Sequence, residues 1–337
     1  MPGGRRITVA KAQFATPCCG DGRILALSST GLGEAASSKE PLRMSTPIAP
    51  VLVTGATGNV GRPVVAALRA LGVPFFAGGT DASRLRRSLG EDVVARHLDL
   101  ADPRTYRDAV RGARGLFLLR PPPIANVEET LNPLIDEAIA AGVEHVTFVS
   151  VDGADRQRWV PHHAVEAHLR RRGISATILR PGFFAQNFGD AYANDIRERD
   201  EILVPAGRGR VAFVDVRDVG ELAANTFVDA ALRHQAWTLT GPAAVTFDEV
   251  AATLATALGR SIRYRPASVL GYVLHLRRCG LPWTQVLVQT VLHVGLRFGN
   301  AAHVDPALGR LLGRPPRTVQ QYVADHVALW TPVRERA

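Results

Sequence analysis

An alternation of two hydrophobic periods between residues 50 and 180 is the strongest constraint on the fold. Short runs of β-forming residues alternate there with longer helical patterns, which is typical of βαβ units around a parallel sheet. Six strands with right-handed crossovers predict a doubly wound parallel sheet of the α/β class. The strands are expected at Pro50–Thr54, Pro74–Gly78, Val93–Leu98, Gly115–Leu119, His145–Ser150 and Ala176–Arg180. The helices are expected at Val60–Leu71, Ser83–Leu89, Thr105–Arg111, Glu128–Ala141 and His162–Arg172.

The alternation loosens after Pro181. Further helices are expected at Phe183–Arg199, Val219–Leu232 and Phe247–Leu258, and short strands at Val211–Val214 and Ala236–Leu239. From Pro266 to Trp330 the pattern is mostly helical, with interruptions at glycine and proline. We interpret residues 50–181, with parts of 211–240, as a Rossmann core. Residues 182–210 and 241–331 are interpreted as a smaller, mostly helical substrate lobe.

The first 43 residues show neither the strand-helix alternation nor a signal peptide. Met44 directly precedes the first expected strand. We therefore expect residues 1–43 to be a disordered leader, or a start placed too far upstream, and residues 44–331 to be the folded chain.

The formal charge of +9 comes almost wholly from scattered arginines. Because they form no basic stripe with aromatic platforms, nucleic acid is not expected as a partner. No membrane partner is expected either, since the most apolar stretch, Cys279–Leu296, is interrupted by Pro282 and polar residues. The three cysteines, Cys18, Cys19 and Cys279, form no metal-binding or disulfide pattern, which suits a cytoplasmic protein.

Three glycines follow the first expected strand in the segment VTGATGNVGR. Gly55 lies where the strand turns, Gly58 where a phosphate would crowd a side chain, and Gly61 where the helix presses on the sheet. Thr57 and Asn59 add side-chain hydrogen bonds. Main-chain N–H groups at a helix start favour anions, so this strand–loop–helix context predicts a dinucleotide pyrophosphate site.

The end of the second strand bears on which dinucleotide binds. An acidic residue there would bind a ribose 2′-hydroxyl, but Gly79 and Thr80 occupy the expected place and Asp81 follows one residue later. Thr80, Ser83, Arg84 and Arg87 are able to surround a 2′-phosphate, which favours NADP(H) and leaves NAD possible. The alternative is that these arginines are only the outer face of a helix. Asp99 is placed either to accept from the adenine amino group or to cap the next helix.

The usual tyrosine–lysine pair of short-chain dehydrogenases is missing. The only lysines are Lys11 and Lys39, and Trp159 and His163 hold the i and i+4 positions where the pair is expected. His163 is a candidate proton source, because histidine titrates near neutrality. His162 is the second candidate, with a core or cleft-lining role as the alternative. No metal site is expected.

A resemblance to a known family is carried by the segments VTGATGNVGR, HLDLADP, LFLLRPPP, PHHAVEAHLRRRGISATILRPGFFAQNF, FVDVRDVGELAA and LLGRPPRTVQQYVADHVALW. The chain resembles the NmrA-like family of atypical short-chain dehydrogenases. The resemblance covers about residues 50–331. It implies a Rossmann domain with a small C-terminal lobe that binds NAD(P). The residues that the resemblance assigns to the pyrophosphate are Gly55, Thr57, Gly58, Asn59, Val60 and Gly61. It places Asp99 and Leu100 at the adenine. Leu119, Arg120 and Pro121 would run along the cofactor, and Pro181, Gly182 and Phe183 would lie beside the nicotinamide.

Two functions stay open at this point. The first is an NAD(P)H-dependent reductase of a small conjugated acceptor such as a quinone, dye or enone. The acceptor is expected in an apolar cleft formed by Phe183, Phe184, Phe188 and the helices of Pro266–Leu296. Quinones and conjugated dyes can take their proton from water, so the absent tyrosine would cost little. The second is a non-catalytic sensor that binds oxidised and reduced cofactor differently and signals through a segment such as Ala185–Arg199. The partner expected is a small molecule, and the chain is expected to be a monomer or homodimer.

Overall fold

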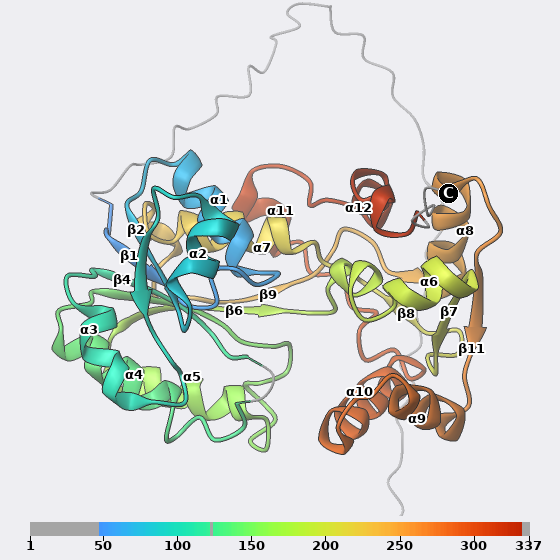
Figure 1. Cartoon of the computed structure of the whole chain (residues 1–337), viewed down its shortest axis with the longest axis horizontal. Coiled ribbons are helices and arrows are strands. Elements are labelled where there is room, and N and C mark those ends of the chain that lie inside the picture. The colour runs from blue at the N-terminus through green and yellow to red at the C-terminus, as the bar shows by residue number, and fades with distance from the viewer. Residues whose placement is uncertain (1–46, 122–123, 332–337) are drawn as a thin grey trace, which may run out of the picture. The chain divides into compact units, whose positions relative to one another are not determined.

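The computed structural model describes residues 47–121 and 124–331. Its main sheet has seven parallel strands in the order β3-β2-β1-β4-β5-β6-β9 (Figure 1). The strands are β1 (Val51–Val53), β2 (Phe75–Gly79), β3 (Val94–His97), β4 (Gly115–Leu119), β5 (His145–Val149), β6 (Ser175–Pro181) and β9 (Ala236–Leu239). The doubly wound α/β fold is therefore confirmed, and β9 joins the sheet beside β6 as a seventh strand.

Helices cover both faces of this sheet (Figure 1). Successive side chains of a strand point to opposite faces, and in β1 Val51 and Val53 pack with one set of helices while Leu52 packs with the other. The first set is α1 (Gly61–Ala70), α2 (Ala82–Leu89), α7 (Val216–Asn225) and α11 (Ala307–Leu312). The second set is α3 (Tyr106–Val110), which follows the 3-10 turn η1 (Pro103–Thr105), with α4 (Leu131–Ala140) and α5 (Pro161–Arg172).

A further apolar cluster lies in the second half of the chain around Phe188, Phe213 and Phe247. Its helices are α6 (Ala193–Arg199), α8 (Phe247–Leu258), α9 (Val269–Arg278), α10 (Trp283–Leu296) and α12 (Val319–Asp325), with the 3-10 turns η2 (Ala185–Gly189), η3 (Ala230–Leu232) and η4 (Val327–Leu329) in the same half. Two small sheets complete it: β7 (Glu201–Val204) pairs parallel with β11 (Arg263–Pro266), and β8 (Arg210–Val211) pairs antiparallel with β10 (Val245–Thr246). The described residues belong to one compact unit.

The second half differs in detail from the pattern expected from sequence. The helix expected at Phe183–Arg199 is divided into η2 and α6, because the chain is still extended at Phe184, which bridges to Val214. The helix expected at Val219–Leu232 is α7, which begins earlier because Asp215 caps it and ends at Asn225. The strand expected at Val211–Val214 is only Arg210–Val211, and β7, β10 and β11 were not expected.

The expectations for residues 1–43, including Cys18 and Cys19, lie outside the described residues. Within the described part of the chain, no helix has both the length and the apolar character needed to cross a membrane.

Candidate functional site

The carboxyl ends of β1 and β4 form the topological switch point of the sheet. From β1 the strand order runs to β2 and β3, and from β4 it runs the other way to β5 and β6. Ligands of open α/β sheets bind outside the strand ends at such a point. Buried Thr54 joins the two ends, because its Oγ1 accepts a hydrogen bond from the Leu119 N–H at 2.9 Å.

The glycine loop between β1 and α1 has a geometry that side chains would block. Gly55 has φ +60°, in the left-handed region, and its main-chain oxygen accepts from the Gly58 N–H at 2.9 Å. A β-carbon on Gly61 would overlap Gly55 O and lie 2.8 Å from Ala56 Cα. Only glycine fits there, so the helix start can press against the loop. The structure thus brings Gly55, Gly58 and Gly61 together as the sequence predicted.

The N-terminus of α1 is open to an anion. Its N-cap, Val60, provides no side-chain hydrogen bond, and the first turn holds no acidic residue. In the first turn Pro63 has no N–H, and the Arg62 N–H donates to Gly58 O at 3.0 Å. The Gly61 N–H and the positive end of the helix dipole are therefore what suits a phosphate here. Arg62 Nε donates to Thr57 O at 3.0 Å. The side chain of Asn59 instead reaches Asp190, with Nδ2 3.3 Å from Oδ2, and so joins the loop to the chain after η2.

The residues predicted to distinguish NADP from NAD lie between the end of β2 and the start of α2. Asp81 is the N-cap of α2, and its Oδ1 accepts from the Arg84 N–H at 3.0 Å. This hydrogen bond holds the pKa of the Asp81 carboxyl below its usual value. Thr80 and Arg84 are exposed beside it. Arg84 thus offers an exposed cation in the first turn of α2.

The end of β3 places Asp99 and Leu100 in a tight turn. Asp99 Oδ1 accepts from the Ala101 N–H at 2.9 Å, while the next 3-10 turn is capped by Asp102. The carbonyl oxygen of Leu100 accepts from the Tyr106 hydroxyl at 2.9 Å. Asp99 therefore stabilises this turn and is not the helix cap that the sequence left as an alternative.

Arg120 and His162 are neighbours just beyond the end of β4. Arg120 Nε donates to His162 Nε2 at 3.3 Å, and Arg120 Nη1 donates to the carbonyl oxygens of Pro121 and Ile124. His162 also lies against Phe148, and its Nδ1 is buried without a hydrogen-bond partner. Burial, with the nearby Arg120 charge, lowers the pKa of His162 to about 3. His162 is therefore uncharged at neutral pH, which favours the structural alternative over a proton source.

His163 differs from its neighbour in exposure and orientation. Its Nδ1 lies 2.8 Å from Ala154 O, and because a carbonyl can only accept, Nδ1 carries the proton of that hydrogen bond. Nε2 is then the ring nitrogen that this contact does not engage. Trp159 stands in the loop before α5 with 77% of its surface exposed.

A buried polar cluster behind α5 was not predicted. Ser150 Oγ donates to Glu166 Oε1 at 2.6 Å, and Arg180 donates to both carboxylate oxygens of Glu166, from Nε at 3.0 Å and from Nη2 at 2.6 Å. Glu166 is fully buried. Its hydrogen bonds raise the pKa of Arg180. The cluster holds the ends of β5 and β6 to α5, which fixes His163 relative to both strands.

The segment after β6 carries the residues expected beside a nicotinamide. Pro181 ends β6, and the main chain is tied to the rest of the fold by the Gly182 N–H on Leu239 O at 3.0 Å and the Val214 N–H on Phe183 O at 2.8 Å. The Phe183 ring is partly buried and lies 5.9 Å from the His293 ring of α10. Phe188 is fully buried in the aromatic cluster and therefore cannot line an open cleft. Of the three phenylalanines expected beside the acceptor, Phe183 and Phe184 are the two that are only partly buried.

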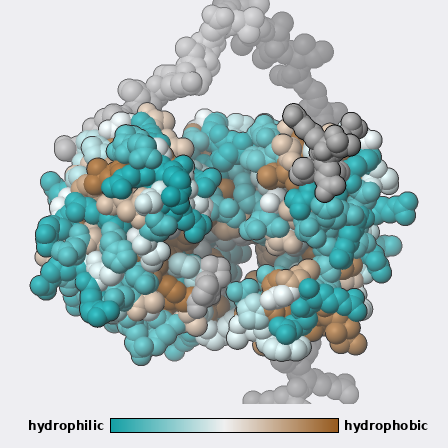
Figure 2. All heavy atoms as spheres, in the orientation of Figure 1, coloured by the Kyte–Doolittle hydropathy of each residue, from teal (hydrophilic) through white to brown (hydrophobic). Residues whose placement is uncertain are grey.

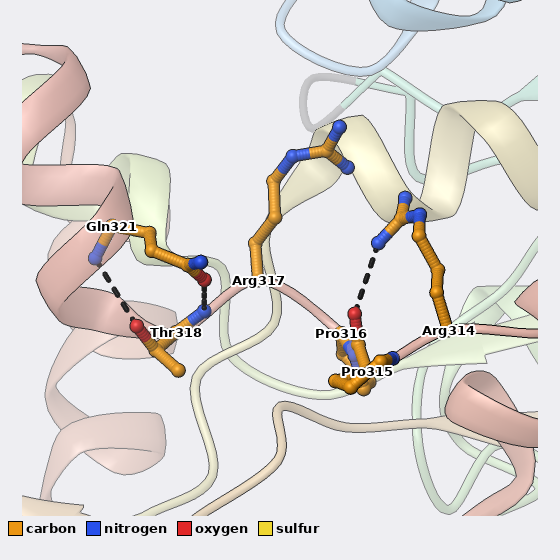
Figure 3. Close-up of a pocket in the computed structure, with 6 residues that line it drawn as sticks. All are labelled: Arg314, Pro315, Pro316, Arg317, Thr318 and Gln321. Atoms are coloured by element: carbon orange, nitrogen blue, oxygen red, sulfur yellow. Dashed lines mark hydrogen bonds between the residues drawn. The ribbon is translucent and has the colours of Figure 1, made fainter.

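None of these residues lines the pocket of about 380 Å³ shown in Figure 3. Its lining is Arg314, Pro315, Pro316, Arg317, Thr318 and Gln321. Arg314 Nη2 is 2.7 Å from Asp218 Oδ1, and the Arg317 N–H donates to Asp218 Oδ2 at 2.6 Å. Thr318 and Gln321 form the capping box of α12. Because these groups hold the chain between α11 and α12 against α7, we assign no ligand to this pocket.

Comparison with known proteins agrees with the fold. A model of the NmrA-like family matches residues 49–295. An NAD(P)H azoreductase of Xenophilus azovorans is 30% identical over 284 residues, covering 82% of this chain and 98% of that protein. The structure of an NADPH-dependent quinone oxidoreductase of Escherichia coli in complex with NADPH is 25% identical, with a TM-score of 0.74 and coverage of 82% of this chain and 99% of that chain. The triphenylmethane reductase of Citrobacter sp. complexed with NADP(H), 23% identical with a TM-score of 0.72 and coverage of 82% and 99%, shares the fold.

Proposed function

The chain belongs to the NmrA-like family, and we propose that it is an NAD(P)H-dependent reductase of small conjugated acceptors, of the quinone or azo-dye type. The similar proteins named above include an NAD(P)H azoreductase and an NADPH-dependent quinone oxidoreductase. The scarcity of cysteine suits a reducing compartment, so the proposal places the reductase in the cytoplasm.

The glycine loop is the observation that carries the proposal. A β-carbon on Gly61 would overlap the loop, Gly55 needs a left-handed φ, and α1 begins without a side-chain cap at the switch point of the sheet. A loop closed this tightly leaves main-chain N–H groups as its donors, which fits a diphosphate. In the proposal Gly55, Thr57, Gly58, Asn59, Val60 and Gly61 surround the diphosphate, and Leu119, Arg120 and Pro121 line the path towards the end of β6.

Arg84 supports NADPH as the preferred donor. It is exposed in the first turn of α2, and the nearest carboxylate, that of Asp81, is hydrogen-bonded to the Arg84 main chain. A 2′-phosphate placed here would meet a guanidinium, the Thr80 hydroxyl and the positive end of a helix. NADH would lack the charged contact, so a preference for NADPH follows from the proposal.

The chemistry assigned to the protein's own residues is modest. Bound at this edge, a reduced nicotinamide supplies a hydride to the acceptor. Pro181 and Phe183 would orient the ring and keep water from one side of it, and Phe184 would offer an apolar surface to a flat acceptor. Reduction of a quinone or azo group also needs protons, which His163 would release from Nε2 while Ala154 O holds Nδ1.

One contact supports the alternative of a non-catalytic sensor. Asn59 in the glycine loop is hydrogen-bonded to Asp190, which directly precedes the segment leading into α6. A cofactor that displaced this contact would change the Ala185–Arg199 segment, and that change would serve as a signal.

Anaerobic titration with NADPH and NADH, followed by a panel of quinones, azo dyes, triphenylmethane dyes and enones, tests the proposal. The absorbance of the reduced nicotinamide reports turnover. We expect tighter binding of NADPH and oxidation by at least one acceptor class. Tight binding without oxidation by any acceptor would select the sensor, and no nucleotide binding would overturn both functions.

A further inference from the structure

The outward sides of α9 and α10 form an apolar surface, named here the α9–α10 face. Hydrophobic residues gather over these two helices at the lower right of Figure 2. The side chains of the face are 47–78% exposed: Leu270, Leu274, Trp283, Leu287, Val288, Val291, Leu292 and Phe298. The opposite side of α10, with Val286, Thr290 and Leu296, is buried. A helix that is apolar towards solvent marks an interaction site.

The charged residues of α9 and α10 have one sign, and the carboxylate of Asp195, 2.8 Å from His275 Nε2 of α9, is buried. From Val250 to Val304 the sequence holds six arginines and no aspartate or glutamate. Arg260 and Arg265 pair with Asp200 and Glu201, and Arg297 donates to main-chain oxygens. The two nearest the face are Arg277, whose guanidinium lies 4.7 Å from the centre of the Trp283 ring, and exposed Arg278. The face therefore has a positive rim, and the described stretch from Val250 to Val304 adds no carboxylate to it.

We propose that the α9–α10 face is a peripheral docking surface for membranes that contain anionic phospholipid. Interfacial helices bury leucine, valine and tryptophan at the boundary between headgroups and acyl chains, and their arginines lie among anionic headgroups. The 14 residues of α10 span about 21 Å, which is too short to cross the hydrocarbon core of a membrane. In the proposal α10 therefore lies along the membrane surface. The proposal does not depend on the reductase function.

The same charges disfavour a second copy of this chain as the occupant. A symmetric dimer through this face would bring Arg277 and Arg278 of both copies near one interface without an acidic partner on α9 or α10. Like charges brought together in an interface oppose association. An anionic lipid surface complements both the apolar centre and the basic rim.

Sedimentation with lipid vesicles tests the proposal. The full chain is mixed with phosphatidylcholine vesicles, with or without about one-third phosphatidylglycerol. We expect binding to the anionic vesicles only, weakened by salt, and a loss of about tenfold or more in the double variant Leu287→Glu with Val291→Glu. The matched control, Leu71→Glu with Val94→Glu, removes the same residue types and adds the same charge at exposed positions of the sheet domain, and we expect it to bind like the parent chain.

Three results would overturn the proposal. Equal vesicle binding by the two double variants would exclude this face. No vesicle binding, with a dimer in sedimentation velocity that only the α10 variant loses, would assign the face to a second copy. Loss of nucleotide-dependent turnover of a water-soluble quinone in the α10 variant alone, with unchanged thermal stability, would make the face an acceptor-binding wall.

Discussion

His162 Nε2 accepts a hydrogen bond from Arg120 Nε at 3.3 Å, which joins the start of α5 to the chain after β4. Within residues 47–121 and 124–331, His162 is one of three buried histidines whose pKa is lowered. Burial is the main cause that lowers the pKa of His145 and of His162 to about 3, and that of His293 to about 4. The unfolded chain therefore binds more protons than the folded chain between these values and about 6.5.

We predict from these three histidines that the free energy of unfolding falls as the pH drops below about 6.5 and continues to fall towards about 3. At pH 5 each histidine is expected to lower the free energy of unfolding by about 2 kcal/mol relative to its value at pH 8. Urea unfolding at pH 8, 6 and 5 measures the change. His145→Gln should reduce the dependence of the free energy of unfolding on pH. His303→Gln, at an exposed position, should leave it unchanged. An equal pH dependence in both variants would contradict the prediction.

Gly58→Asp is predicted to abolish binding of both NADPH and NADH. A β-carbon at this position lies 3.2 Å from Gly55 O, and the added carboxylate would face the diphosphate in a loop built for anions. We expect a loss of about 100-fold or more in affinity, measured by calorimetry. Gly58→Ala is the matched control, because it adds the same β-carbon without the charge and should retain much more of the affinity. Retained affinity in Gly58→Asp would place the diphosphate elsewhere.

Arg84→Glu is predicted to change the choice of nucleotide. Removing the guanidinium and adding a carboxylate beside Asp81 should lower NADPH affinity by about tenfold or more and leave NADH affinity within about twofold. Arg86→Glu makes the same charge change in α2 at an exposed position, and should affect NADPH much less. Equal losses for both nucleotides in Arg84→Glu would mean that Arg84 supports α2 and does not read the 2′-phosphate.

The sheet and the glycine loop were predictable because both depend on local sequence. Strand period, helix period and glycine spacing are read within a few residues, and β9 was found in this way at its true bounds. The buried role of Glu166 in α5 was not predicted, because from the sequence it looks like a surface neighbour of Arg170. Its partners are far along the chain: Ser150 directly follows β5, and Arg180 is in β6. The uncharged state of His162 likewise depends first on its burial in the fold and then on Arg120, 42 residues away.

The α9–α10 face shows a second reason why the sequence does not predict every functional surface. From the sequence, the helices of Pro266–Leu296 are interpreted as a wall of the acceptor cleft, and Cys279–Leu296 is too interrupted for a membrane span. The sequence pattern gives the same apolar spacing for a buried helix and for one that exposes its apolar side. Which side of α10 meets the aromatic cluster is decided by contacts such as Phe183 with His293. Those contacts join residues 110 positions apart, beyond the reach of periodicity.

His163→Ala tests whether α5 delivers a proton. If Nε2 of His163 is the donor, kcat should fall by about tenfold or more, while the affinity for NADPH stays within about twofold because the side chain is not assigned to nucleotide binding. His168→Ala is the control on the same helix: its Nε2 lies 2.7 Å from Asp136, on the side of α5 that packs towards α4, and kcat should be unchanged. An unchanged kcat would assign the proton to water, and the acceptors would then be those, like quinones, that need no protein acid.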